Sequence, residues 1–149
     1  MSIPWSKSDS NFDELWLGEP DRPAGVPDIL QTMFKQQREH MEKYAEIAPD
    51  AQVPPELWGD IDNRQVQAAV REFASYTVEE LYEAINHLKN KPWKQTDKTT
   101  DLGAFHEELA DAWHFWIEMH IIAGIDPTAV FRAYFAKTLI NKERQSNGY

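Results

Sequence analysis

The chain contains no cysteine, so neither disulfide bonds nor cysteine-ligated zinc can stabilise it. No basic, apolar, small-residue segment typical of secretion signals opens the sequence. No run approaches the roughly 18 uncharged apolar residues that a membrane-spanning helix needs. These absences predict a soluble protein with no membrane partner and a cytoplasmic location.

Positive charge is scarce, because 15 Lys and Arg stand against 25 Asp and Glu and leave a formal net charge of −10. A protein that binds a nucleic-acid polymer needs a basic surface to release counterions, so we expect no such partner. The sequence also lacks a glycine-rich phosphate loop of the Walker kind. A small anion bridged by a metal ion is still compatible with this composition.

Apolar residues recur at helical spacing, whereas alternating segments that would predict strands are absent. The expected helices run from Asp28 to Pro49, from Asn63 through Phe73, from Thr77 to about Asn90, from Leu109 to Ala123, and from Asp126 to about Gln145. The predicted fold is all-α, a bundle of four long helices with one short extra helix, within a single domain over residues 27–149. Residues 1–26 show no periodic pattern and are predicted to form an extended N-terminal arm.

Two carboxylate pairs are the most informative feature of the chain. Glu80 with Glu83, and Glu108 with Asp111, are each three residues apart in a predicted helix, so each pair shares one helix face. Four carboxylates brought together on two packed helices would repel one another unless a cation lay among them. Because oxygen ligands suit hard cations, the pairs predict bound Mg²⁺, with Mn²⁺ as the alternative.

Other interpretations of these acids remain open at this stage. Thr77 and Glu80 fit a capping box, in which the glutamate returns to the start of its own helix. Glu107 competes with Glu108 as the partner of Asp111, and any of the helical acids could form a solvated face. A di-iron site is not expected, because it needs two Glu-x-x-His units and the chain offers only Asp111 with His114 as an approximate match.

The last predicted helix carries the complementary chemistry. Lys137, Asn141 and Arg144 are spaced i, i+4 and i+7, with Tyr134 one turn earlier, so their side chains line one face. Such donors suit a phosphate chain, although polar residues on a last helix also occur simply as a solvent-facing surface. Together with the carboxylate pairs they predict a site for a metal-bound nucleoside triphosphate.

Several strings resemble the all-α nucleoside triphosphate pyrophosphohydrolases. They are Glu80-Leu-Tyr-Glu83, Lys91-Pro-Trp-Lys94 and Glu108-Leu-Ala-Asp111-Ala-Trp-His114-Phe115. The ending, with Tyr134, Lys137, Asn141, Arg144, Gln145, Gly148 and Tyr149, is similar to the dimeric dUTPases and especially to the bacteriophage dCTPase/dUTPase branch. The resemblance covers residues from about 28 to 149.

The resemblance implies Mg²⁺-dependent hydrolysis of dUTP or dCTP to the monophosphate and pyrophosphate. It implies that Glu80, Glu83, Glu108 and Asp111 hold the metal, and we assign Glu83 as the proton acceptor for the attacking water. The phosphate-binding residues would be Lys137, Arg144, Asn141 and Tyr134, and the base- and sugar-binding residues would be Gln37, Trp93, His114 and Phe115. For Trp93 and Phe115, packing in the core is the alternative role.

Base preference is not fixed by the resemblance. Gln37 matches a position that contacts the pyrimidine edge, but Met41 stands where uracil-specific relatives commonly carry asparagine, and His40 could compensate. We also expect a homodimer, because Trp113, Trp116 and Ile121 exceed what one small core hides. The rival functions are a MazG-like housecleaning pyrophosphohydrolase of other base specificity and a non-enzymatic helical interaction module.

Overall fold

The computed structural model describes residues 28–50, 53–94 and 99–148, so the predicted arm at 1–26 lies outside the described residues. Four α-helices fill most of these ranges: α1 (Ile29–Ile47), α2 (Arg64–Asn86), α3 (Leu102–Ile122) and α4 (Pro127–Ser146), with a 3₁₀ turn, η2 (Pro55–Leu57), between α1 and α2. The described residues contain no strand. The predicted all-α class is confirmed.

The helices divide into two compact units. One unit runs from Met33 to Ile125 and contains most of α1 together with η2, α2 and α3. The other contains the described residues from Asp126 onward, which include α4, and the first residues of α1 up to Thr32. None of the helices in the described ranges combines the length and apolar character needed to cross a bilayer.

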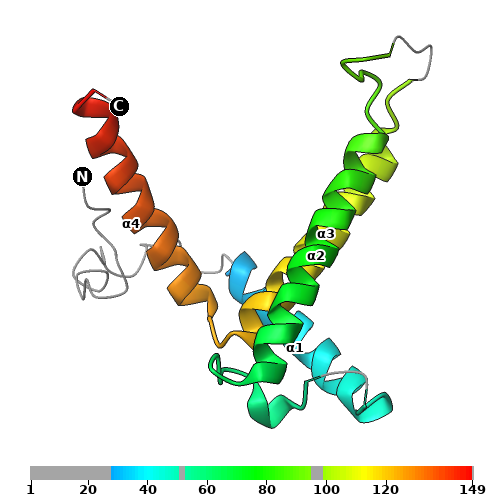
Figure 1. Ribbon diagram of the computed structural model, residues 1–149, viewed down its shortest axis with the longest axis vertical. Coiled ribbons are helices and arrows are strands. Elements are labelled where there is room, and N and C mark those ends of the chain that lie inside the picture. The colour runs from blue at the N-terminus through cyan, green and yellow to red at the C-terminus, as the bar shows by residue number, and fades with distance from the viewer. Residues whose placement is uncertain (1–27, 51–52, 95–98, 149) are drawn as a thin grey trace. The chain divides into compact units, whose positions relative to one another are not determined.

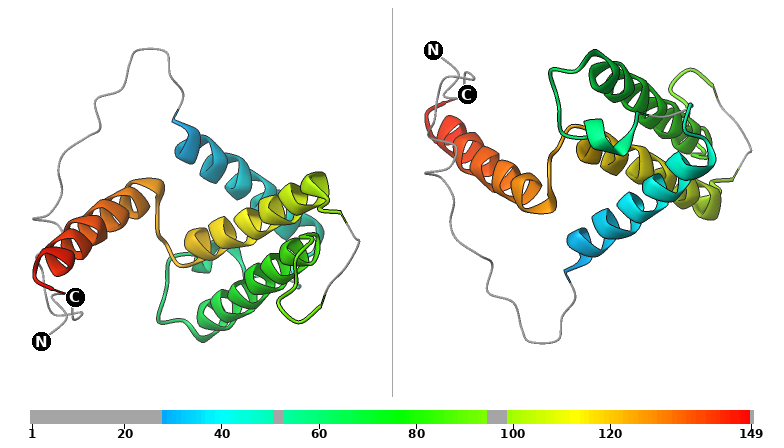
Figure 2. Two further views of the ribbon diagram at one scale, coloured as in Figure 1. Left: turned by 90° about the horizontal axis from the view of Figure 1, so that it is seen from above. Right: turned by 90° about the horizontal axis from the view of Figure 1, so that it is seen from below.

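Helices α2 and α3 lie antiparallel and side by side, and they form the centre of the larger unit (Figures 1 and 2). Small residues make this close approach possible. The buried face of α2 carries Ala69, Thr77 and Ala84, and that of α3 carries Ala112. The distance between two packed helices depends on the side chains at their contact, and small residues there allow the backbones to lie close together.

Helix α1 packs against the second half of α3 through a mixed apolar and polar contact. Phe34 meets the ring of His120 edge-on, with 6.1 Å between ring centroids. Phe34, Gln37 and Met41 are the buried residues of α1. Burial of a large apolar side chain stabilises a fold by about 1.5–3 kcal/mol, so Phe34 and Met41 hold the helix in place.

The helix boundary predicted at Thr77 is wrong. Thr77 does not begin a helix, because α2 is continuous from Arg64 to Asn86 and starts where the Asn63 side chain accepts a hydrogen bond from the backbone N–H of Gln65 at 2.9 Å. The Thr77 hydroxyl donates to the carbonyl of Phe73 at 2.8 Å, which satisfies it inside the helix. The short extra helix is therefore part of α2, and the capping-box interpretation of Glu80 is wrong.

Helix α3 begins seven residues earlier than predicted. The Asp101 side chain accepts from the backbone N–H of Ala104 at 3.0 Å, which caps the helix before Leu102. Glu108 therefore lies within the helix together with Asp111, as the spacing of this carboxylate pair predicted. Its carboxylate consequently has the fixed direction of a helical side chain.

The end of α3 is held by a close approach of two glycines. Gly124 has φ +77° and Gly59 has φ +93°, and a Cβ built on Gly124 would come within 2.7 Å of the Cα of Gly59. The N–H of Gly59 donates to the carbonyl of Ile122 at 2.9 Å. This contact ties the loop after η2 to the C-terminal end of α3.

Helix α4 starts and ends close to its predicted positions. The Asp126 side chain accepts from the backbone N–H of Ala129 at 2.7 Å, and Pro127 occupies the first helical position. The helix ends at Ser146, one residue beyond the predicted Gln145.

Candidate metal centre and adjoining pocket

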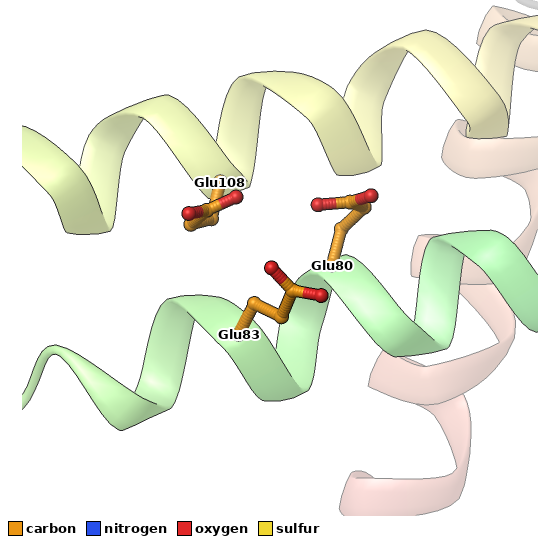
Figure 3. A group of neighbouring side chains, drawn as sticks. All are labelled: Glu80, Glu83 and Glu108. Carbon is orange, nitrogen blue, oxygen red and sulfur yellow. The ribbon is translucent and has the colours of Figure 1, made fainter.

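Three carboxylates meet between α2 and α3. Glu80 and Glu83 come from α2 and Glu108 comes from α3, and one carboxylate oxygen from each lies within 4.8 Å of the others. We call these three residues the acidic cluster. Figure 3 shows their side chains pointing toward one another across the space between the two helices. Glu80 and Glu108 are half-buried, whereas Glu83 is exposed.

The positions of these acids follow from the packing of the two helices. Glu80 lies between Thr77 and Ala84 on the buried stripe of α2, at spacings of three and four residues. Glu108 precedes the buried Ala112 of α3 by four residues. The small residues allow the two backbones to approach closely, and the glutamate side chains lie between α2 and α3.

The electrostatics of the acidic cluster are unfavourable for the bare carboxylates. The pKa of Glu80 is raised, first by partial burial, then by the charges of Glu83, Asp111 and Glu108, and by a hydrogen bond with Glu108. A raised carboxyl pKa means that the ionised form is destabilised in its surroundings. A divalent cation would remove this cost, and an all-oxygen donor set suits Mg²⁺ or Mn²⁺.

Asp111 lies beside the acidic cluster but is not one of the three carboxylates that converge within 4.8 Å. Its charge acts on Glu80. Of the two neighbouring glutamates on α3, Glu108 joins the cluster, whereas Glu107 is exposed. The predicted quartet is thus a group of three with Asp111 next to it.

His87 adjoins the acidic cluster and was not singled out from the sequence. Its Nε2 atom lies 3.5 Å from Oε1 of Glu108, at the C-terminal end of α2. The spacing of Glu80, Glu83 and His87 is i, i+3 and i+7, which places all three on one face of a helix. That spacing was the available signal in the sequence.

A pocket of about 520 Å³ opens next to the acidic cluster, because Glu80 and Asp111 form part of its wall. All of its lining residues belong to the larger unit and come from α1, α2 and α3. They are Gln36, Gln37, His40, Glu80, Asp111, His114, Phe115 and Glu118.

A chain of hydrogen bonds crosses this pocket from α1 to α3. Nε2 of Gln37 donates to Oε1 of Glu118 at 2.6 Å, and Oε1 of Gln37 lies 2.7 Å from Nδ1 of His114. Because the amide oxygen can only accept, Nδ1 of His114 carries the proton. Gln37 is only 5% exposed, so its amide is held by these two partners. We call Gln37, His114 and Glu118 the glutamine network.

Glu118, which lines the pocket, is another residue that was not singled out from the sequence. Burial raises its pKa from the ordinary 4.5 to about 7, and the hydrogen bond from Gln37 opposes that rise. The signal was its place in the most apolar helix of the chain, four residues after His114 and seven after Asp111. Those spacings put all three on one face of α3.

The predicted base-binding aromatics have different surroundings. Phe115 lines the pocket and also packs on α2, with its ring centroid 5.2 Å from that of Tyr76 and 6.1 Å from that of Phe73. Trp93 is 80% exposed and does not line the pocket. Met41 is a core residue at 2% exposure, while His40 lines the pocket.

The predicted phosphate-binding residues all lie on α4, in the other compact unit. Tyr134 and Asn141 are exposed, and Lys137 and Arg144 are half-buried. They share a helix face as their spacing predicts, and their role in binding phosphate stays a prediction.

Comparison with known proteins finds one informative similarity. The chain is 28% identical over 145 residues to a dCTP pyrophosphatase of Enterobacteria phage LZ5, and the match covers 82% of this chain and 83% of that protein. No family model and no solved structure matches the chain. The similarity extends over most of both proteins.

Proposed function

We propose that the protein is a Mg²⁺-dependent pyrophosphohydrolase that cleaves dCTP or dUTP to the monophosphate and pyrophosphate. The observation that carries this proposal is the acidic cluster, with three carboxylates from two helices within 4.8 Å at the edge of a pocket. The similarity to a phage dCTP pyrophosphatase supports the choice of substrate class. Mn²⁺ would satisfy the same donor set.

Glu80, Glu83 and Glu108 would hold the metal, with Asp111 contributing from the adjoining turn. Bound there, Mg²⁺ supplies charge stabilisation on the phosphate oxygens and makes a coordinated water more acidic. Glu83 is the exposed member of the acidic cluster, so its carboxylate is accessible to accept the proton of the attacking water. The new bond joins the water oxygen to phosphorus, and the bond that breaks lies between the α- and β-phosphates.

The pocket would receive the pyrimidine nucleoside. Gln37, His114 and Phe115 line the pocket. The Gln37 amide would meet the base edge, His114 would meet the deoxyribose, and the Phe115 ring would stack on the base. Trp93 would complete the stacking pair, and Lys137, Arg144, Asn141 and Tyr134 of α4 would bind the phosphates.

We also propose a homodimer. Apolar residues remain exposed on both helices of the central pair. They are Val78, Leu81, Tyr82 and Ile85 on α2, and Trp113 and Trp116 on α3. Exposed apolar surface of this kind is covered when two copies associate. Ile121 does not belong to this set, contrary to expectation, because it is a core residue at 2% exposure.

The decisive experiment is to incubate the purified protein with each nucleoside triphosphate in turn, with Mg²⁺ or with a chelator, and to measure pyrophosphate. We expect release from dCTP or dUTP that the chelator abolishes. Cleavage of purine or damaged nucleotides instead would point to a MazG-like housecleaning enzyme. No cleavage of any nucleotide, and no metal binding, would favour a helical interaction module.

A further inference from the structure

One carboxylate in the pocket has no part in the proposed hydrolysis. Glu118 stands outside the acidic cluster and contacts Gln37 instead, at 2.6 Å. Its carboxylate is half-buried on α3, and it forms part of the pocket wall. Burying an ionised carboxylate costs free energy unless a partner at the site interacts with it.

Glu118 fixes the orientation of the Gln37 amide. An ionised carboxylate has acceptors only, so the NH₂ end of the amide must face Glu118, and the carbonyl end then accepts from Nδ1–H of His114 at 2.7 Å. Turning the amide over would place two acceptors against each other at Glu118 and two donors against each other at His114. With Gln37 only 5% exposed, little water is available to compensate.

The glutamine network therefore offers a ligand a defined set of unused groups. Gln37 retains one N–H and one lone pair on its oxygen, and Glu118 retains most of its lone pairs. Acceptors outnumber donors on this part of the wall. Burial raises the pKa of Glu118 and the hydrogen bond from Gln37 opposes that rise, so a further donor supplied by a ligand would stabilise the ionised carboxylate.

Cytosine and uracil differ at the edge that such a wall would recognise. Cytosine presents a 4-amino donor next to the N3 acceptor, whereas uracil presents a 4-oxo acceptor next to an N3–H donor. The amino group can donate to a carboxylate, and N3 can accept the remaining N–H of Gln37. Above about pH 7, where Glu118 is mostly ionised, the 4-oxo group of uracil in the same place would face the carboxylate with no proton between them.

We propose that Glu118 selects cytosine over uracil, by holding the Gln37 amide in one orientation and by accepting a hydrogen bond from the 4-amino group. This inference rests on the proposed function, in which the pocket receives a pyrimidine nucleotide. It makes Glu118 a specificity-determining residue and leaves the hydrolytic step to the acidic cluster.

The test compares kcat/KM for dCTP and dUTP in the wild type and in Glu118→Gln, which has nearly the same shape but an amide that can donate or accept. The wild type is expected to prefer dCTP. In the variant the ratio of kcat/KM for dCTP to kcat/KM for dUTP should fall at least about tenfold. The amide that replaces the Glu118 carboxylate can donate as well as accept a hydrogen bond, so it no longer rejects uracil. Glu107→Gln, an exposed acid on the same helix, is the matched control and should leave the ratio unchanged.

A purely structural role for Glu118 predicts a different pattern. In that case Glu118→Gln would lower kcat/KM for dCTP and for dUTP together and leave their ratio within about twofold of the wild-type ratio. That result would overturn the proposal. Helical circular dichroism checks that Glu118→Gln is folded. Glu118→Asp provides a second variant, which keeps the charge and should retain a preference for dCTP; a preference for dUTP there would also contradict the proposal.

Binding of the monophosphates separates this inference from the proposed function. Calorimetric titration with dCMP and dUMP needs no catalysis, and dCMP should bind more tightly in the wild type but not in Glu118→Gln. If the wild type cleaves neither triphosphate yet shows this pattern, the hydrolytic function fails and base selection stands. If it cleaves triphosphates but prefers dUTP and dUMP, or binds neither monophosphate, the inference fails whatever the fate of the hydrolysis.

Discussion

The acidic cluster and the glutamine network lie side by side in one unit, yet they are organised in opposite ways. The cluster gathers Glu80, Glu83 and Glu108 within 4.8 Å, so like charges face one another. In the glutamine network each contact pairs a donor with an acceptor, at 2.6 and 2.7 Å. The first arrangement is complementary to a cation, and the second to a neutral ligand with its own donors and acceptors. A nucleoside triphosphate offers both, a metal-bound phosphate chain and a base.

The largest effect should follow from neutralising a carboxylate of the metal site. Glu83→Gln keeps the side-chain shape but removes a ligand and the assigned proton acceptor, so kcat should fall by about 10²–10⁴-fold while the fold is retained. Asp111→Asn should also lose activity. Pyrophosphate release measures the activity, and circular dichroism checks that the fold is retained.

Glu79→Gln is the matched control, because Glu79 is an exposed acid on the same helix and lies outside the acidic cluster. It should retain wild-type activity. Full activity in Glu83→Gln or Asp111→Asn would remove that residue from its assigned role.

Metal binding should stabilise the protein through the acidic cluster. A ligand that binds only the folded state adds about 2.7 kcal/mol at a concentration one hundred times its dissociation constant. Thermal unfolding in saturating Mg²⁺ should therefore occur several degrees higher than in chelator. The shift should be absent in Glu80→Gln/Glu108→Gln, and an equal shift in that variant would locate the metal elsewhere.

A smaller effect is expected from the glutamine network, through the raised pKa of Glu118. The folded protein holds this proton more tightly than the unfolded chain does, so Glu118 lowers stability as the pH rises from 4.5 to about 7. Glu118→Gln removes this loss and should be more stable than the wild type at pH 8, by about 1 kcal/mol after allowance for partial exposure.

Urea unfolding at pH 8 and pH 4 measures this difference. At pH 4 the two proteins should have nearly equal stability, because Glu118 is protonated in both folded and unfolded wild type. A Glu118→Gln variant less stable than the wild type at pH 8 would show that the charged hydrogen bond to Gln37 outweighs the cost of burial.

The smallest expected effect is a change in folding stability when Glu80 is neutralised. Its pKa is also raised, so its ionisation opposes folding as the pH rises through the acidic range. In metal-free protein at pH 8, Glu80→Gln should be more stable than the wild type by only about a few tenths of a kcal/mol, since solvent screens the charge of this half-buried carboxylate. Urea unfolding in chelator should give the opposite ranking from unfolding in saturating Mg²⁺, and an unchanged ranking would separate Glu80 from the metal.

Helical spacing was enough to predict the fold class and the pairs of acids that share a face. Local boundaries were harder, because Thr77 resembles a cap in the sequence and only the structure shows its hydroxyl bonded to the carbonyl of Phe73. Asp101 was a usable cap signal for α3, but the predicted start relied on the apolar run beginning at Leu109.

The glutamine network shows what spacing alone could not predict. The i+4 and i+7 positions of Glu118 place it on the face of His114 and Asp111, but its contact with Gln37 joins residues 81 positions apart in the chain. Such a contact depends on how α1 packs against α3, which no local pattern encodes. The same limit applies to His87 and Glu108, whose 3.5 Å approach depends on the pairing of α2 with α3.

The most direct test of the account is a titration of metal-free protein with Mn²⁺, followed by electron paramagnetic resonance of the free ion. The wild type and Glu79→Gln should bind Mn²⁺, whereas Glu80→Gln/Glu83→Gln/Glu108→Gln should leave it free at the same concentrations. Equal binding by the triple variant, or no binding by the wild type even with dCTP present, would contradict the claim that the acidic cluster is a metal centre.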